Sequence, residues 1–124
     1  MRYLIISIMN GKQLKNKEVN MRYRILTGIN DPDIHYVGEF EANYSTLCKH
    51  FGKPQPGSAD GKTDAIWYLE FENSLKATIY NWKNGKSYLG KAGLDLENIK
   101  EWNVGAIDRI VVDYIREMLE VSPI

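Results

Sequence analysis

The sequence predicts an α+β fold: a mainly antiparallel β-sheet with a short central helix and an amphipathic C-terminal helix packed on it. Runs rich in β-branched and aromatic residues, separated by Asn, Gly and Pro, occupy most of the first 82 positions. Near the C-terminus, apolar residues recur at helical spacing instead. Strands followed by a covering helix are typical of α+β proteins. At 124 residues, the chain is expected to form a single domain, 1–124.

Three strands are expected at the N-terminal end. Residues 2–9 are rich in strand-forming residues and end at an Asn-Gly turn signal. A second strand is expected over 22–28 and a third over 35–41, with an Asn-Asp-Pro turn at 30–32 between them. Because such turns join neighbours in space, we expect these strands to pair as a meander.

A short helix is expected over 43–52. Asn43 can cap its start, apolar residues recur along it, and Gly52 favours its end with a proline just beyond. Residues 53–63, rich in Pro, Gly and Ser, are expected to be a loop.

A β-hairpin is expected within 62–82, with its turn at Asn73-Ser74. A two-residue turn would pair Trp67 with Tyr80 and Leu69 with Thr78. Both faces then mix polar and apolar side chains, so this pairing leaves open which face meets the core. A long polar loop, edged by aromatic residues and lysines, follows the hairpin.

The last element is an amphipathic helix expected over 106–119 and packed on the sheet. Six apolar residues recur there at i, i+3, i+4, i+7, i+8 and i+11: Ile107, Ile110, Val111, Tyr114, Ile115 and Met118.

The composition argues against several partners. Lys plus Arg and Asp plus Glu number 16 each, so the molecule has no overall attraction to a polyanion or an anionic membrane, and no specific nucleic acid is expected. Cys48 is the single cysteine, which suits a reducing compartment. With no signal-peptide pattern and no apolar run near 18 residues, we expect a cytoplasmic protein without a membrane partner.

No catalytic residue or metal ligand is expected. Gly85-Lys86-Ser87 matches the end of a phosphate-binding P-loop, but the pattern's first glycine falls on Tyr80 and a glycine-rich loop follows. Cys48 and His50 are two apart and would diverge on a helix. The chain is therefore expected not to be an enzyme, with no cofactor.

Glu70 and Glu72 share a strand face at about 7 Å, a spacing compatible with acid–base chemistry. Solvated strand carboxylates are the better account of this pair.

An aromatic and basic set from the hairpin's end and the following loop has the chemistry of a nucleotide site: Tyr80, Trp82, Lys83, Asn84, Lys86 and Tyr88. A base stacked on Trp or Tyr gains about 1–3 kcal/mol, and Lys or Asn beside it can meet phosphate or a base edge. The alternative is that Trp67, Trp82 and Trp102 belong to the core. The expected ligand-binding residues are Tyr80, Trp82, Asn84, Lys86, Tyr88 and Trp102, together with Arg109.

Arg109 is included because it lies near the start of the last helix. The helix dipole disfavours a cation there unless an anion is bound as well. The alternative is an ion pair with Asp113, four residues on.

Three segments carry a resemblance to small bacteriophage and prophage proteins. They are Lys-Thr-Asp-Ala-x-Trp at 62–67, Ala-Thr-Ile-Tyr-Asn-Trp-Lys-Asn-Gly-Lys-Ser-Tyr-Leu-Gly at 77–90, and Glu-Trp-Asn-Val-Gly at 101–105. Over residues 44–120 the chain is most similar to the anti-Thoeris sponge family, β-sheet proteins with C-terminal helices that form oligomers.

The resemblance implies a function. Members of this family sequester the cyclic ADP-ribose signal of a Thoeris enzyme, and some hold cyclic oligonucleotides, without cleaving them. It implies that Arg109 contacts phosphate and that Trp82 or Tyr80 stacks on a base, although Asp113 stands where a second arginine would be expected.

We therefore expect a phage-encoded anti-defence protein that acts as a homo-oligomer in the host cytoplasm and binds a cyclic nucleotide signal. The alternative is a protein-directed inhibitor of a host defence enzyme, of the anti-CRISPR or anti-restriction type.

Overall fold

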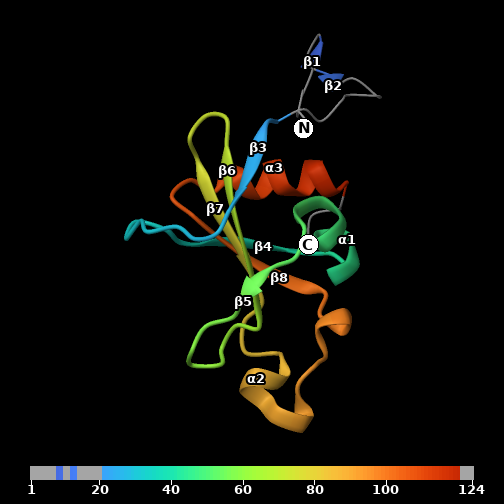
Figure 1. The fold of residues 1–124 in the computed structure, drawn as a ribbon. Coiled ribbons are helices and arrows are strands. Elements are labelled where there is room, and N and C mark those ends of the chain that lie inside the picture. The colour runs from blue at the N-terminus through green and yellow to red at the C-terminus, as the bar shows by residue number, and fades with distance from the viewer. Residues whose placement is uncertain (1–7, 10–11, 14–20, 121–124) are drawn as a thin grey trace.

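A six-stranded sheet forms the centre of the computed structural model, which describes residues 8–9, 12–13 and 21–120 (Figure 1). The strand order is β3-β6-β7-β8-β4, with β5 paired to the same edge of β6 as β3, and each pair is antiparallel. The strands are β3 (Tyr23–Leu26), β4 (His35–Glu41), β5 (Gln55–Pro56), β6 (Ala65–Phe71), β7 (Lys76–Tyr80) and β8 (Glu101–Ala106).

Two further strands, β1 (Ile8–Met9) and β2 (Lys12–Gln13), pair with each other in a separate ladder. Most of the strand expected over 2–9 lies outside the described residues. The strand expected over 22–28 is shorter, as β3, and that over 35–41 is confirmed as β4.

The expected meander is wrong, because β3 and β4 lie at opposite edges of the sheet. Residues 27–34 cross the sheet between them. A Cβ on Gly105 would lie 3.3 Å from Ile34 Cγ2 and 2.6 Å from Thr78 Oγ1, so this connection passes over the face that carries Thr78. The apolar strands β6, β7 and β8 take the centre, where their backbone groups are paired on both sides, and the more polar strands take the edges.

The β6–β7 turn differs from the expected two-residue turn. Ser74 N donates to Phe71 O (2.9 Å), Phe71 N donates to Leu75 O (2.8 Å), and Ser74 has φ 70°. This is a three-residue loop in which a type I turn is followed by a left-handed residue. Its extra residue shifts the register by one.

The shifted register separates the two faces of the hairpin. Trp67 now pairs with Ile79 and Leu69 with Ala77, so their face is apolar. The other face pairs Ile66 with Tyr80, and also carries Tyr68, Glu70, Lys76 and Thr78. A one-residue slip moves every side chain of a strand to the opposite face.

The apolar face of the sheet packs against α1 (Tyr44–Phe51) and α3 (Ile110–Leu119). Helix α1 confirms the helix expected over 43–52; Asn43 is its N-cap residue, although its side chain makes no capping bond. Buried core residues come from four strands and both helices, among them Phe40, Leu47, Phe51, Trp67, Leu69, Ile79, Trp102, Val104, Val111 and Ile115.

The C-terminal helix begins later than expected. Residues 101–106, with Trp102, Val104 and Ala106 buried, form strand β8, and α3 starts at Ile110. Ile107 precedes the helix and is 52 % exposed. The apolar spacing in the sequence extends to Ile107, so the expected helix began too early. The alternation of apolar residues over 101–106, which indicates a strand, was not recognised.

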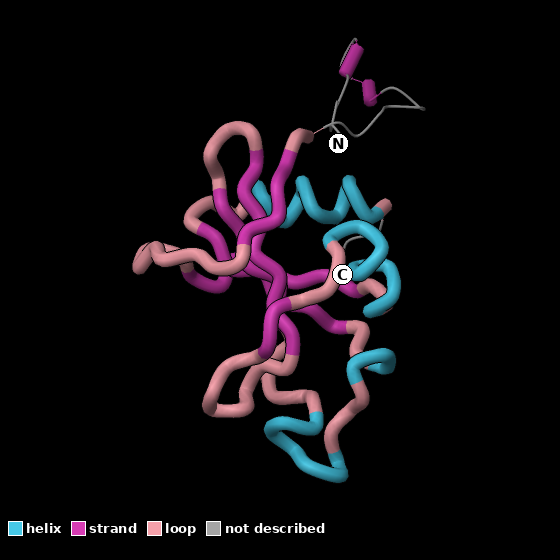
Figure 2. Tube along the Cα trace, viewed as in Figure 1, coloured by secondary structure: helices cyan, strands magenta, loops and turns pink. Residues whose placement is uncertain are grey.

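Residues 81–100, called here the loop lobe, extend beyond the sheet at the end of the molecule away from α3 (Figures 1 and 2). The loop lobe contains α2 (Lys86–Leu89) and the 3₁₀ turns η1 (Gly90–Ala92) and η2 (Leu96–Asn98). Within the described part of the chain, no helix has the length and apolar character needed to cross a membrane.

Candidate functional site

The loop lobe is joined to the sheet by the buried side chain of Asn81. Its Oδ1 accepts hydrogen bonds from the amides of Asp64 (2.7 Å) and Ala65 (3.1 Å). Its Nδ2 donates to Asp64 Oδ1 (2.8 Å) and Asn84 Oδ1 (2.9 Å). The amide group thus uses two acceptor and two donor positions, which is how a buried polar side chain avoids a desolvation cost.

Asp64 continues this network to α2. Its Oδ2 accepts a hydrogen bond from the amide of Ser87 (3.2 Å), in the first turn of the helix. Gly85 lies against the Asp64 carboxylate, and a Cβ there would collide with it. The carboxylate therefore occupies the space beside Gly85-Lys86-Ser87 that a phosphate would need in a P-loop.

Trp82, Lys62, Lys83 and Tyr88, called here the Trp82 site, form the exposed aromatic and basic group of this region. Trp82 is 46 % exposed. Lys62 Nζ lies 5.8 Å and Lys83 Nζ 5.4 Å from its ring centroid, and Lys83 Nζ also lies 5.7 Å from the ring of Tyr88. These are cation–π distances.

The two lysines differ in their anionic partners. Lys62 Nζ lies 3.7 Å from Asp60 Oδ2, whereas Lys83 has no carboxylate partner within the described residues. A hydrogen bond from the Ser58 hydroxyl, followed by smaller contributions from Lys62, lowers the pKa of Asp60. Lys83 is therefore the cation most available to an anionic ligand.

Tyr80 lies at the inner edge of the Trp82 site. Its ring meets that of Trp82 edge-on, with centroids 6.3 Å apart, and it stands opposite Asn103 on the sheet. Burial raises the pKa of Tyr80, while its hydrogen bond with Asn103 acts in the opposite direction. The hydroxyl is thus a neutral polar group beside the exposed indole.

Asn84 and Lys86 have structural partners. Asn84 Oδ1 accepts from Asn81, and Lys86 Nζ is 3.1 Å from Asp95 Oδ1. Lys83 belongs to the aromatic and basic set seen in the sequence, although it was not among the expected ligand-binding residues. Sequence reasoning missed Lys62, because only the fold brings it to the Trp82 ring.

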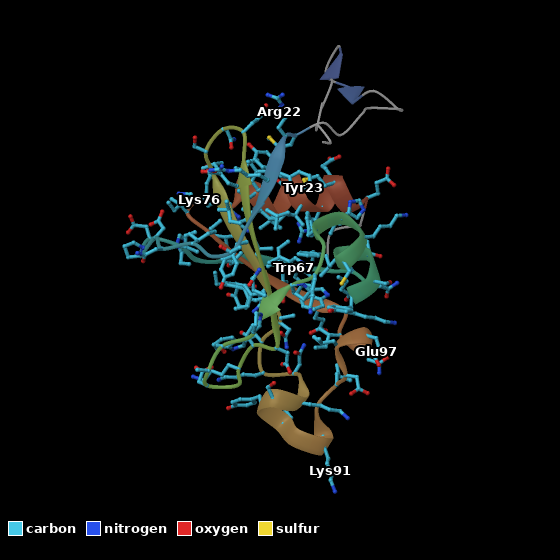
Figure 3. The ribbon with its side chains drawn as sticks, viewed as in Figure 1. Arg22, Tyr23, Trp67, Lys76, Lys91 and Glu97 are labelled. Carbon is cyan, nitrogen blue, oxygen red and sulfur yellow. The ribbon has the colours of Figure 1, made fainter. Side chains whose placement is uncertain are left out.

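Trp102 lies in the core. Its indole Nε1 donates to Ala42 O (3.0 Å), and its ring packs edge-on against Trp67 at 5.4 Å. Both rings are fully buried, and Figure 3 shows Trp67 in the interior, between the sheet and α1. The alternative stated for the tryptophans, that they belong to the core, is therefore correct for Trp67 and Trp102. Trp102 has no exposed surface with which to contact a ligand.

Arg109 lies at the opposite end of the sheet from Trp82. Tyr80 pairs with Asn103 at the loop-lobe end of β7 and β8, and Ala77 pairs with Ala106 at the end from which the chain leads to Arg109. The two ends are three residues apart along the strand, about 10 Å, before the chain turns away at each. The structure does not bring Arg109 to the aromatic loop.

The surroundings of Arg109 already contain an anion. Asp108 Oδ1 accepts a hydrogen bond from Ile110 N (2.9 Å) and so satisfies an amide at the start of α3. Arg109 and Arg116 line a cleft of about 280 Å³ between β4 and α3. Within the described residues, Arg109 forms no ion pair with Asp113 or any other carboxylate.

A hollow of about 520 Å³ lies beside β3 and the β6–β7 turn, lined by Arg22, Arg24, Glu70 and Glu72 among others. Arg24 forms a salt bridge with Glu70 there. Basic and acidic residues are matched in this hollow, so it offers no net attraction to an anion.

In the portion of the chain that the structure describes, no group of three His, Cys, Asp or Glu side chains is placed to hold a metal ion. No family model, curated protein or solved structure matches the chain.

Proposed function

We propose that this protein binds and sequesters a cyclic nucleotide immune signal, a cyclic ADP-ribose isomer or a cyclic oligonucleotide, and does not cleave it. The observation that supports this best is Lys83, whose ammonium group lies near both Trp82 and Tyr88 and has no carboxylate partner among the described residues. A nucleotide has the matching chemistry: a flat base for the rings and a phosphate for the ammonium group.

The energies of these contacts suit a binding protein. Stacking of one base on an aromatic ring contributes about 1–3 kcal/mol. A hydrogen bond between charged groups contributes about 1.5–3 kcal/mol. Since the molecule carries a formal net charge of zero, its attraction for an anion is local to this site.

The biological setting is part of the proposal. The resemblance to anti-Thoeris sponges supports a phage-encoded anti-defence protein that acts in the host cytoplasm as a homo-oligomer. Native mass spectrometry of the purified protein tests whether it is a homo-oligomer and whether it retains a signal molecule, because it reports the subunit number and any retained small molecule together.

Isothermal titration with cyclic ADP-ribose isomers and with cyclic di- and trinucleotides tests the binding itself. We expect at least one to bind, and Trp82→Ala to weaken it by about ten-fold or more, as loss of one stacked base requires. Ile107→Ala is the matched control, because Ile107 is 52 % exposed but follows the far end of β8.

No heat with any of these compounds would refute the proposed function. The absence of turnover has its own test: a bound signal should be recovered unchanged after the protein is denatured by heat. A chemically altered product would instead identify a nucleotide-processing enzyme.

A second candidate, a protein-directed inhibitor of a host defence enzyme, is favoured by two leucines. Leu89 and Leu94 are exposed in the loop lobe: Leu89 follows Tyr88 in α2, and Leu94 N donates to Asn84 O (2.9 Å). Exposed aromatic and aliphatic side chains of this kind act as anchors in protein interfaces. A host protein that is captured by the wild type and lost on Leu89→Ser with Leu94→Ser, while nucleotide affinity is absent in both, would favour this candidate.

A further inference from the structure

We propose that Asp64 and Asn81 are positioning residues for the Trp82 site. Their hydrogen bonds hold the loop 57–64 against residues 81–88, at the spacing that brings Lys62 and Lys83 close to the Trp82 ring. The inference rests on the proposed function for its biological purpose, but its geometry can be tested without a nucleotide.

The Trp82 site is assembled from two segments that are far apart in the sequence. Lys62 comes from the loop before β6, whereas Trp82, Lys83 and Tyr88 follow β7. The direct link between the two lysines is a backbone hydrogen bond from Lys83 N to Lys62 O (2.7 Å). Lys83 has φ 57° there, a left-handed conformation that a lysine adopts only where its surroundings hold it.

Asp64 and Asn81 provide those surroundings. Asn81 accepts from the amide of Asp64 and donates to its carboxylate, and the second carboxylate oxygen accepts from Ser87 N. Both carboxylate oxygens thus accept from the segment 81–88. An asparagine at position 64 has one oxygen, so its NH₂ group would face a donor and one of the two bonds would be lost.

Close packing provides a second, independent link between the segments. Gly61 has φ 79°, and a Cβ there would lie 2.7 Å from Ser87 O. Gly61→Ala is therefore expected to push the two segments apart without touching the polar network. Gly90 has a similar φ of 61° but no atom within 4 Å of its Cβ position, so Gly90→Ala is the matched control for backbone strain.

Fluorescence quenching can measure the surroundings of Trp82 directly, because Trp67 and Trp102 are 1 % and 0 % exposed. Iodide is an anionic quencher and acrylamide a neutral one. A lysine about 6 Å away raises the local iodide concentration by about two- to three-fold. The ratio of iodide to acrylamide quenching, at constant low ionic strength, thus reports how close the two ammonium groups are to the ring.

Positioning and simple electrostatics predict opposite results for Asp64→Asn. Removal of a nearby negative charge would by itself raise the ratio of iodide to acrylamide quenching. We expect this for Asp60→Asn, which removes the carboxylate partner of Lys62. Loss of positioning should instead lower this quenching ratio by about two-fold. We expect a lower ratio for Asp64→Asn and Gly61→Ala, and an unchanged ratio for Gly90→Ala.

A raised or unchanged ratio in both Asp64→Asn and Gly61→Ala would overturn the inference. The same proteins, titrated with cyclic ADP-ribose, separate it from the proposed function. If the ratios fall as expected but the wild type binds no nucleotide, the positioning is upheld and the proposed function fails. If the wild type binds and neither variant changes the ratio or the affinity, the function is upheld and the positioning fails.

Discussion

At the scale of single residues, Lys83 is the side chain on which the candidate site most depends. We expect Lys83→Met to weaken binding of the cyclic nucleotide by about ten-fold or more, because a hydrogen bond to a charged group contributes about 1.5–3 kcal/mol. Isothermal titration measures the change. Lys91→Met is the control, since Lys91 is an exposed cation at the tip of the loop lobe and points away from the sheet (Figure 3). Equal losses in both variants would contradict a specific role for Lys83.

Tyr44, packed near Trp67 and Trp102, gives a prediction about pH. Burial, with smaller contributions from Cys48 and Glu97, raises the pKa of Tyr44 to about 12. Its folded-state pKa thus lies above the unfolded value of 10.0, so the unfolded state loses this proton first as the pH rises. The stability that depends on the neutral hydroxyl is complete below pH 10 and is lost between pH 10 and about 12.

Urea unfolding at several pH values tests this sign. The wild type should lose stability more steeply than Tyr44→Phe above pH 10, because phenylalanine cannot ionise. The comparison between the two proteins removes the titration of the other tyrosines and lysines. Parallel curves would show that Tyr44 ionises equally in both states.

At the scale of elements, the β6–β7 turn decides which face of the hairpin is buried. Ser74 adopts φ 70°, which a residue with a Cβ tolerates poorly. We expect Ser74→Gly to raise the free energy of unfolding by about 0.5–1 kcal/mol. Urea denaturation measures it, with Ser45→Gly in α1 as the control, where loss of helix propensity should lower stability. A destabilised Ser74→Gly variant would contradict the left-handed turn.

The start of α3 gives a second prediction at this scale. Ile107 and Ile115 share one apolar pattern in the sequence, but Ile107 is 52 % exposed and Ile115 is fully buried. Ile115→Ala should lower the free energy of unfolding by about 2–5 kcal/mol, because it leaves a cavity in the core. Ile107→Ala should change it by less than about 0.5 kcal/mol. Similar losses for the two variants would mean that the helix begins before Ile110.

At the scale of the whole molecule, the two parts of the site expected from the sequence lie at opposite ends of the sheet. Trp82 leaves the end of β7 where the loop lobe begins, and Arg109 follows the far end of β8. We therefore expect Arg109→Ala to leave nucleotide affinity within about two-fold of the wild type, since a screened charge beyond a Debye length of about 10 Å contributes little. Titration of Arg109→Ala beside Trp82→Ala measures this. A ten-fold loss for Arg109→Ala would place the ligand at the other end.

Local patterns predicted most elements but not their arrangement. Helix α1 and strand β4 followed from capping and strand-forming residues. Strand β8 was missed even though apolar Trp102, Val104 and Ala106 alternate along it, because a glycine-containing stretch next to a helical pattern was assigned to the loop and the helix. The edge positions of β3 and β4 depend on which strands best fill the centre, and this cannot be read from either strand alone.

Only part of the candidate site could be predicted, because some of its contacts involve residues that are distant in the sequence. Trp82 and Tyr88 are both exposed, and Lys83 lies within cation–π distance of both rings, because Trp82 and Lys83 follow β7 closely and Tyr88 lies in α2 shortly after them. Asn84 and Lys86 have the right chemistry but are used in contacts with Asn81 and Asp95, which come from elsewhere in the chain.

The sequence by itself determined the α+β class and the aromatic and basic character of the loop that follows β7. These properties depend on residue types and short-range spacing. Only the tertiary structure decided that Trp102 is core, that Trp82 is exposed and that Lys62 joins it. The physical reason is that burial and long-range neighbours follow from strand register, which here depends on one extra residue in the turn at Ser74, and from hydrogen bonds such as those of Asn81 that join distant segments.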